Sequence, residues 1–332
     1  MTPDRLGEED DLPFVESNGI TTCYDEFGDA HERVMLLIMG VGEQLIAWPD
    51  GFCALFAGHG FRVIRFDNRD IGLSTWLDEL GDVDLAGLLA GDLSTVRYGL
   101  SDMVADTAGL LEALNVSRAH LVGASMGGGI AQQVAIDHPQ LVASLASIMS
   151  TTSDGVSGGS CLEDPTALVP QADADREAAV AADVALYQLI GSPGFKTSET
   201  ELTRRAAAKF DRAFHPAGTL RQIAANATAT NRTQALHTLK VSTVVIHSDS
   251  DPLVNVSGGR ATADAVPGAE LVVIPGMGHD LPEGAWSRMP TPSPRTPPKP
   301  DRTTSARRSS TNPDGEPSGA GAATSSLTPT QI

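Results

Sequence analysis

The stretch of sequence that decides the fold is HLVGASMGGGIAQQ, residues His120 to Gln133. An apolar run typical of a buried strand ends at Ala124, and a segment of helical character begins after Ser125. The five residues from Gly123 to Gly127 fit the pattern G-x-S-x-G, in which a serine occupies a sharp turn between a strand and a helix. Such a turn lifts the serine hydroxyl above the sheet and points helix N–H groups at the same place. Ser125 is therefore a candidate nucleophile, and the alternative is an unreactive serine in a glycine-rich turn.

Two other kinds of glycine-rich binding site do not fit this stretch. A phosphate-binding loop is disfavoured because no Lys-Ser or Lys-Thr pair follows the glycines. The dinucleotide spacing G-x-G-x-x-G is also absent, so the sequence implies no nucleotide cofactor here.

On both sides of this stretch, short apolar segments recur along the chain. They alternate with segments whose apolar residues have helical spacing. Continuous apolar strands separated by helices are typical of an α/β fold with a mostly parallel sheet covered on both faces. One helix is expected over residues 101–115, with Ser101 or Asp102 as its N-cap. The segments predicted as strands are residues 33–40, 61–67, 118–125, 141–149, 242–248 and 269–275.

A nucleophilic serine needs a base, and the base needs a carboxylate that orients it. In folds of this kind the chain order is serine, acid, histidine, and ligands bind beyond the carboxyl ends of the strands. Asp251 and His279 each follow a predicted strand in that order, so they are the candidate acid and base. Asp249 is an alternative acid, although Pro252 fixes the turn just after Asp251. His247 is the one serious rival base.

The run His-Ser-Asp-Ser-Asp, residues 247–251, also raises the possibility of a metal site. A calcium loop would need a glycine and a distal glutamate at set spacing, and neither is present. We therefore predict no metal and no cofactor. His120, at the start of the strand before Ser125, is expected to be structural.

Two backbone N–H groups are predicted to stabilise an oxyanion beside Ser125. The first belongs to Met126, which follows the nucleophile, and the second to Val41, in the loop after an early strand. An ordinary strand-to-helix turn at Val41 would look the same in the sequence.

The composition limits the classes of protein that the chain can belong to. Its 332 residues carry a formal net charge of −19, which disfavours nucleic acid and anionic membranes as partners. Three widely spaced cysteines form neither a disulfide framework nor a zinc pattern, and the acidic N-terminus lacks the apolar core of a signal peptide. No apolar run is long enough to span a bilayer. We expect a cytoplasmic protein with no membrane insertion.

The alternation of strands and helices divides the chain into four parts. Residues 1–18 are interpreted as an N-terminal extension, residues 19–150 and 240–288 as the core, and residues 151–239 as a helical cap inserted into it. Residues 289–332 are rich in Pro, Ser and Thr and have the composition of a disordered tail.

Taken together, these residues resemble the α/β-hydrolase superfamily, and more closely the esterase branch with the aclacinomycin methylesterases and related bacterial carboxylesterases and lipases. The resemblance implies a cofactor-free serine hydrolase with Ser125, Asp251 and His279 as its triad and Val41 and Met126 as its oxyanion hole. It also implies that Asp67 and Arg69 brace their loop rather than react. The stretches that carry the resemblance are residues 36–52, 60–75, 119–132, 242–254 and 274–286.

The function expected from this resemblance is hydrolysis of a small, hydrophobic carboxylic ester. A thioesterase, a lactonase or a perhydrolase would use the same triad, and a non-catalytic member is a further alternative. The one large departure follows Trp286, where Pro290 stops a helix that such proteins continue. One hypothesis is that a frameshift replaced that helix with the proline-rich tail.

Overall fold

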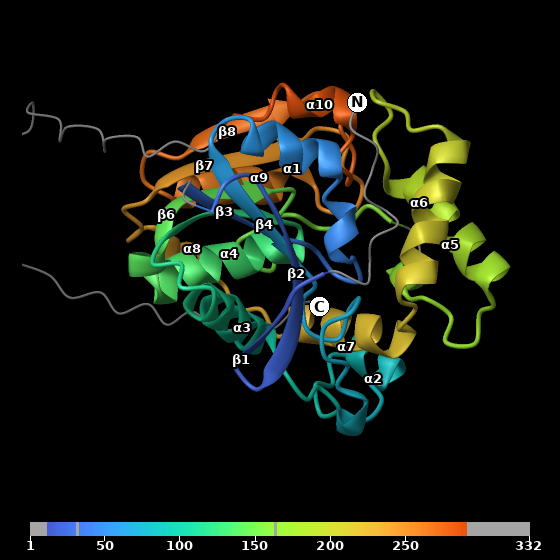
Figure 1. Ribbon diagram of the computed structural model, residues 1–332. Helices are drawn as coiled ribbons and strands as arrows, with labels where there is room; N and C mark the ends of the chain where they lie inside the picture. Colours follow the sequence, from blue (N-terminus) through green and yellow to red (C-terminus); the bar gives the residue numbers. More distant parts are fainter. Residues whose placement is uncertain (1–11, 31–32, 163–164, 291–332) are drawn as a thin grey trace, which may run out of the picture. The chain divides into compact units, whose positions relative to one another are not determined.

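The computed structural model describes residues 12–30, 33–162 and 165–290, and within them the chain forms one twisted sheet of eight strands (Figure 1). The strand order is β1-β2-β4-β3-β5-β6-β7-β8. Strands β3 to β8 run parallel to one another, and β2 is antiparallel to both β1 and β4. The strands are β1 Phe14–Ser17, β2 Ile20–Phe27, β3 Arg33–Ile38, β4 Phe61–Phe66, β5 Ala119–Ala124, β6 Val142–Ile148, β7 Ser242–Ser248 and β8 Glu270–Ile274.

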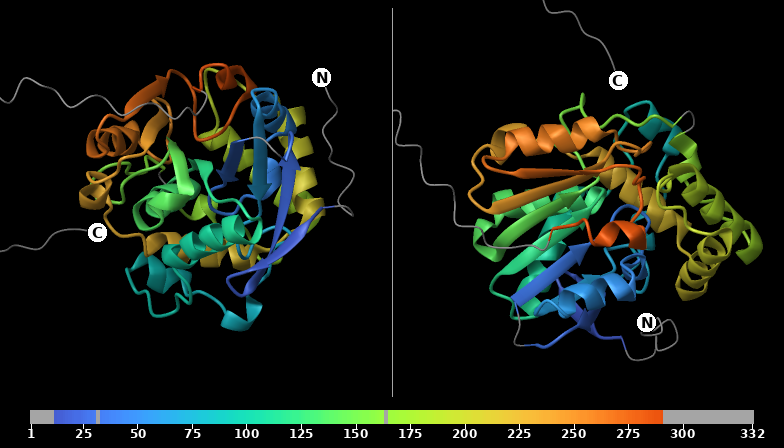
Figure 2. Two further views of the ribbon diagram at one scale, coloured as in Figure 1. Left: turned by 60° about the vertical axis from the view of Figure 1, so that its left-hand side comes forward. Right: turned by 90° about the horizontal axis from the view of Figure 1, so that it is seen from above.

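Helices cover both faces of the sheet, and each face has its own apolar core. Helices α3 and α4 contribute to one core, and α1 and α10 contribute to the other. Figure 2 shows these layers from two further directions. The central strands are apolar on both sides because both faces are covered, as predicted. The helices are α1 Asp50–Ala57, α2 Leu85–Leu89, α3 Leu100–Ala113, α4 Met126–Asp137, α5 Arg176–Ile190, α6 Glu199–Arg212, α7 Pro216–Ala227, α8 Thr233–Leu236, α9 Val256–Ala265 and α10 Glu283–Trp286.

Two local features differ from the sequence-based expectation. Strand β1 pairs with β2, although the predicted division places residues 1–18 outside the core. Helix α3 spans Leu100–Ala113, and its N-cap is Gly99 rather than the predicted Ser101 or Asp102. Asp102 still contributes to this end of the helix, because its carboxylate accepts a hydrogen bond from the Gly99 N–H at 2.8 Å.

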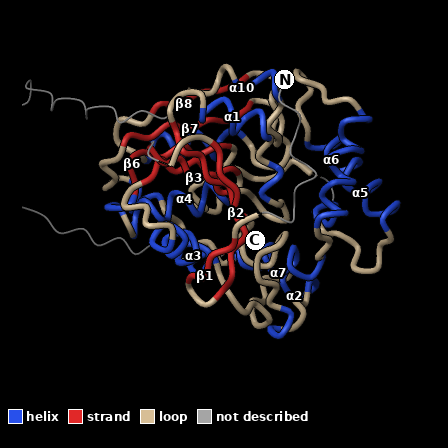
Figure 3. Tube along the Cα trace, in the orientation of Figure 1, coloured by secondary structure: helices blue, strands red, loops and turns tan. Residues whose placement is uncertain are grey.

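The segment predicted as a cap, residues 151–239, contains helices and no strand in its described part (Figure 3). Helices α5 and α6 pack mainly on each other, and Figure 1 shows them to one side of the sheet. The short helix α8 instead contacts the core helices α4 and α9.

The described C-terminal part ends just after α10. Met289 is buried in the same core as α1, so packed structure continues two residues beyond Ser287. The proline-rich tail predicted from the sequence lies outside the described residues, apart from Met289 and Pro290. Among the described helices, none combines the length and the apolar character that crossing a bilayer requires.

Candidate active site

Ser125 occupies the turn between β5 and α4 in a backbone conformation that is rare for a residue with a side chain, with φ of 56° and ψ of −122°. The two flanking glycines are explained by close backbone contacts. A Cβ atom on Gly127 would lie 2.1 Å from the carbonyl oxygen of Ile38, and one on Gly123 would lie 2.1 Å from the carbonyl oxygen of Gly127. The spacing of the motif thus reflects the tight packing of α4 against the ends of β3 and β5.

The structure brings three of the predicted site residues together in a line. His279 Nε2 lies 3.0 Å from Ser125 Oγ, and His279 Nδ1 lies 2.8 Å from Asp251 Oδ2. Asp251 and His279 are buried, and Ser125 is partly exposed. With the proton of the neutral imidazole on Nδ1, Nε2 is free to accept a proton from the serine hydroxyl.

The two aspartates in the loop after β7, Asp249 and Asp251, have different roles. Asp251 Oδ1 accepts hydrogen bonds from the N–H groups of Leu253 and Val254, which leaves Oδ2 for His279. Asp249 is exposed and accepts a hydrogen bond from the Gly276 N–H, and this bond lowers the pKa of its carboxyl. Asp249 therefore braces the histidine loop and has no contact with the imidazole.

The rival base, His247, contacts the loop that carries Asp251 rather than Ser125. Its Nε2 is 2.8 Å from the Val254 carbonyl oxygen and 3.7 Å from Asp251 Oδ2. Burial lowers the pKa of His247, so the ring is neutral and donates its Nε2–H to Val254. It supports the loop that holds Asp251.

One predicted oxyanion donor, Met126, directly follows Ser125, and the other, Val41, is in a loop that comes close to Ser125. Met126 is the first residue of α4, where the backbone N–H groups have no partner within the helix. Val41 follows Gly40, and a Cβ on Gly40 would lie 3.0 Å from the Ser125 Cβ. Within the described residues, no hydrogen bond uses the N–H of Val41 or of Met126.

Asp67, predicted to brace its own loop after β4, also holds the loop after β3. Its carboxylate is fully buried and accepts hydrogen bonds from the N–H groups of Leu45 and Leu73. Arg69 makes a buried ion pair with Asp106 on α3. Both residues brace the loop without contacting Ser125, His279 or Asp251 in the described structure.

The histidine loop is held by the chain that leaves α5. The His279 N–H donates to the Ile190 carbonyl at 2.7 Å, and the Gly278 N–H donates to Ser192 Oγ at 2.8 Å. Ser192 in turn donates a hydrogen bond to the carboxylate of Asp280. Residues 190–194 therefore fix the backbone that carries the imidazole.

A cluster of ionisable groups lies between the loop after β3 and helices α5 and α6. Lys209 on α6 contacts Glu43 at 2.5 Å and Asp183 on α5 at 2.9 Å. Burial raises the pKa of Glu43, while Lys209 opposes that shift. No pattern in the sequence indicates this cluster, because its three members come from separate segments of the chain.

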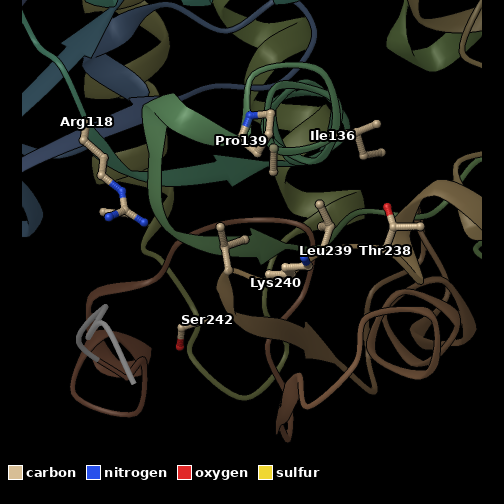
Figure 4. A pocket seen from close by; sticks show the side chains of 10 residues that line it. Arg118, Ile136, Pro139, Thr238, Leu239, Lys240 and Ser242 are labelled. Atoms are coloured by element: carbon tan, nitrogen blue, oxygen red, sulfur yellow. The ribbon is translucent and has the colours of Figure 1, made fainter. Parts of the chain in front are cut away.

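No cluster of three or more His, Cys, Asp or Glu side chains in the described structure could hold a metal ion. A pocket of about 480 Å³ lies near the amino ends of β6 and β7, whereas Ser125, Asp251 and His279 follow the carboxyl ends of strands (Figure 4). Arg118 and Lys240 are its charged residues, and it contains none of the predicted site residues.

Two residues that support the site were missed by the sequence analysis, namely Gln222 on α7 and Ser192 after α5. Gln222 contacts Gly42, a partner 180 positions away in the chain, and Ser192 contacts Gly278, 86 positions away. A single glutamine or serine has no spacing pattern that would indicate such a contact.

Comparison with known proteins identifies the family of the chain. The family model described as "alpha/beta hydrolase fold" matches residues 33–284, and the chain belongs to this family. The chain is 26% identical over 291 residues to rhodomycin D methylesterase DauP of Streptomyces sp. (strain C5), a match that covers 81% of this chain and 92% of that protein.

Solved structures show the same fold. A hydrolase from Pseudomonas aeruginosa PA01 is similar with a TM-score of 0.61 and 25% identity, covering 82% of this chain and 93% of that one. The enol-lactonase from Burkholderia xenovorans LB400 has a TM-score of 0.64 at 21% identity, with 80% and 92% coverage. The predicted fold class and the resemblance are confirmed, and the protein is a hydrolase.

Proposed function

We propose that this hydrolase cleaves carboxylic esters through a covalent acyl-enzyme on Ser125. The observation that carries the proposal is the line of hydrogen-bonding atoms from Ser125 Oγ through the imidazole of His279 to Asp251. Serine is a weak nucleophile at its ordinary pKa, and an adjacent base oriented by a buried carboxylate is what activates it.

In the first half of the reaction, Ser125 Oγ forms a bond to the ester carbonyl carbon and gives its proton to His279 Nε2. Asp251 stabilises the resulting imidazolium through the Nδ1–H bond at 2.8 Å. The tetrahedral intermediate collapses when the bond to the alcohol oxygen breaks, and the alcohol leaves with the proton from Nε2.

The carbonyl oxygen becomes negatively charged in the intermediate, and the N–H groups of Val41 and Met126 are proposed to hold it. Both donors are free of other partners in the described residues, and Met126 stands at the positive end of the α4 dipole. Preorganised donors of this kind commonly supply the largest single part of the rate enhancement.

In the second half, water attacks the acyl carbon while His279 takes one of its protons. The bond to Ser125 Oγ then breaks, the serine regains its proton, and the carboxylic acid leaves. The relative DauP, which is 26% identical, is named as a methylesterase. This name supports an ester rather than an amide as the substrate class. We infer a small ester with an apolar acyl group, on the basis of the apolar side chains that segments 182–190 and 210–214 contribute beside the charged Asp183, Asp211 and Arg212.

The test is labelling with a fluorophosphonate probe followed by intact-mass measurement, together with hydrolysis of p-nitrophenyl esters from acetate to decanoate. We expect one adduct and ester turnover in the wild type, and neither in Ser125→Ala. Ser250→Ala, at a partly exposed serine in the loop that carries Asp251, is the matched control and is expected to label normally.

A folded wild-type protein that forms no adduct would refute the proposal and favour a non-catalytic member of the family. An adduct without turnover of oxygen esters would favour a thioesterase, a lactonase or a perhydrolase on the same residues. Thioester, lactone and peracid assays would separate these three.

A further inference from the structure

The loop that carries Val41 is held from the cap side at two places: Glu43 and Gln44 contact α6, and Gly42, next to Val41, contacts Gln222 on α7. Gln222 is fully buried, with 0% of its surface exposed. Its Oε1 accepts a hydrogen bond from the Gly42 N–H at 2.9 Å, and its Nε2 donates to the Arg69 carbonyl at 2.7 Å. One amide thus ties the loop after β3 to the turn after β4.

The backbone at Gly42 packs too closely against α7 to accept a side chain. Gly42 has a φ of +71°, which disfavours any other residue, and a Cβ there would lie 2.8 Å from the Thr219 methyl carbon. The neighbouring residue on one side is Val41, whose N–H is the proposed oxyanion donor. The Gly42 N–H belongs to the peptide that follows the one carrying the Val41 N–H, so holding it limits the backbone rotations at Val41 by which that donor could turn away.

A neutral amide suits this place better than other side chains. It offers one donor and one acceptor, which match the Arg69 carbonyl and the Gly42 N–H. An apolar side chain of the same size would leave both backbone groups buried and unpaired, and the loop would relax to satisfy them.

We propose that Gln222 is a positioning residue for the oxyanion hole: it acts through Gly42 to hold the Val41 N–H where the carbonyl oxygen of the substrate becomes charged. This inference rests on the proposed function, because it assigns Gln222 a role in the same ester hydrolysis. A residue with this role affects the transition state more than it affects binding of the substrate.

The experiment compares Gln222→Met with Gln132→Met. Gln132, on α4, is likewise 0% exposed, donates to Ser147 Oγ at 3.0 Å and accepts from Arg232 Nε at 3.0 Å. Both substitutions remove two buried hydrogen bonds, but only the first touches the oxyanion loop. The measurements are kcat and KM for p-nitrophenyl butyrate, the Ki of an aryl trifluoromethyl ketone that forms a tetrahedral adduct with serine, and Tm.

We expect Gln222→Met to lower kcat by about tenfold or more, since complete loss of one oxyanion donor costs roughly 100- to 1000-fold. The Ki of the ketone should rise by a similar factor, while KM changes little. Gln132→Met should lower Tm and leave kcat and Ki near the wild-type values. If Gln222→Met does not fold, Gln222→Asn, whose amide is too short to reach both partners, should show the same parallel loss.

Equal kcat and Ki effects in the two methionine variants, or a change in Tm alone for the Gln222 variants, would overturn the positioning role. An inactive wild type without an adduct on Ser125 would instead refute the proposed function, and the inference with it. The wild-type labelling result thus separates the two failures.

Discussion

The conformation of Ser125 illustrates how much of the site depends on single residues. A non-glycine residue at φ of 56° and ψ of −122° costs about 1–3 kcal/mol, and the surrounding backbone must enforce it. The Ser125 N–H donates to the Ile148 carbonyl at 2.9 Å, and α4 begins at the next residue. Strand β6 and helix α4 therefore hold the serine in a strained position that presents its hydroxyl to His279.

His120 has a different role, because it is a buried neutral base that couples stability to pH. It is 4% exposed, and its Nδ1 lies 2.7 Å from Ser144 Oγ. Burial, together with Arg33 and Arg118, lowers the pKa of His120 from 6.5 to about 4. Between these two values the unfolded chain binds a proton that the folded protein does not, so the free energy of unfolding falls as the pH falls from 6.5 to 4.

The prediction is that His120→Gln reduces the loss of stability on acidification. From the size of the pKa shift, the wild type should lose about 3 kcal/mol more than the variant between pH 7 and pH 4. Urea unfolding at a series of pH values measures this difference. His59→Gln, at an exposed histidine, is the control, and identical pH slopes for wild type and His120→Gln would contradict the assignment.

At the scale of elements, two loops that carry the site are held by the segment inserted between β6 and β7. The chain leaving α5 binds the backbone of the histidine loop, and α7 binds the loop after β3. Helix α4 meets the ends of β3 and β5 so closely that side chains are excluded at Gly123 and Gly127.

Alanine substitutions at two glycines of α4 distinguish the effect of this close packing on stability from the effect of helix propensity. In Gly127→Ala the new methyl group would lie 2.1 Å from the Ile38 carbonyl oxygen, so the helix must move and the variant should lose about 3 kcal/mol or more of stability. In Gly129→Ala the nearest atom is the end of the Arg232 side chain at 3.3 Å, and alanine favours the helix by about 1 kcal/mol. We therefore expect a much smaller change for Gly129→Ala in thermal and urea unfolding. Similar losses in the two variants would show that packing against β3 is not the cause.

At the scale of the whole molecule, the features that could be predicted are those that produce a local pattern in the sequence. Apolar strands, the G-x-S-x-G turn and polar residues after strand ends all leave such a pattern, and the predicted fold class was confirmed. Strand β1, with four residues, is too short to show a clear period. The Gly99 cap was missed because the helix-stabilising carboxylate of Asp102 lies inside the helix rather than before it.

Contacts between distant segments were the part that could not be predicted. Gln222 and Ser192 have no distinctive neighbours in the sequence, and the Glu43–Lys209–Asp183 cluster joins three separate segments. Periodicity records whether a side chain is buried, but not which partner it meets. Ser125, Asp251 and His279, which the structure brings together, could be proposed from the sequence because their order and their position after strands follow from the fold.

A buried ion pair attaches the inserted helices to the core. Its contribution to stability can be tested by comparing two arginines, one buried and one exposed. Arg212, at the end of α6, pairs with Asp67 at 2.7 Å, and the two side chains are 1% and 0% exposed. Arg176, at the start of α5, pairs with Asp211 at 2.6 Å, where the side chains are 54% and 55% exposed. A buried charge that loses its partner is strongly destabilising, whereas an exposed pair competes with water and contributes little.

We predict that Arg212→Met lowers the free energy of unfolding by about 3–5 kcal/mol, because Asp67 is left as an unpaired buried charge. Arg176→Met should cause little measurable change. Adding Asp67→Asn to Arg212→Met should recover part of the loss, since the amide removes the charge while its oxygen can still accept from Leu45 or Leu73. Urea unfolding of the four proteins measures these differences. If the double variant is no more stable than Arg212→Met alone, lost packing of the arginine side chain, rather than the unpaired carboxylate, accounts for the effect.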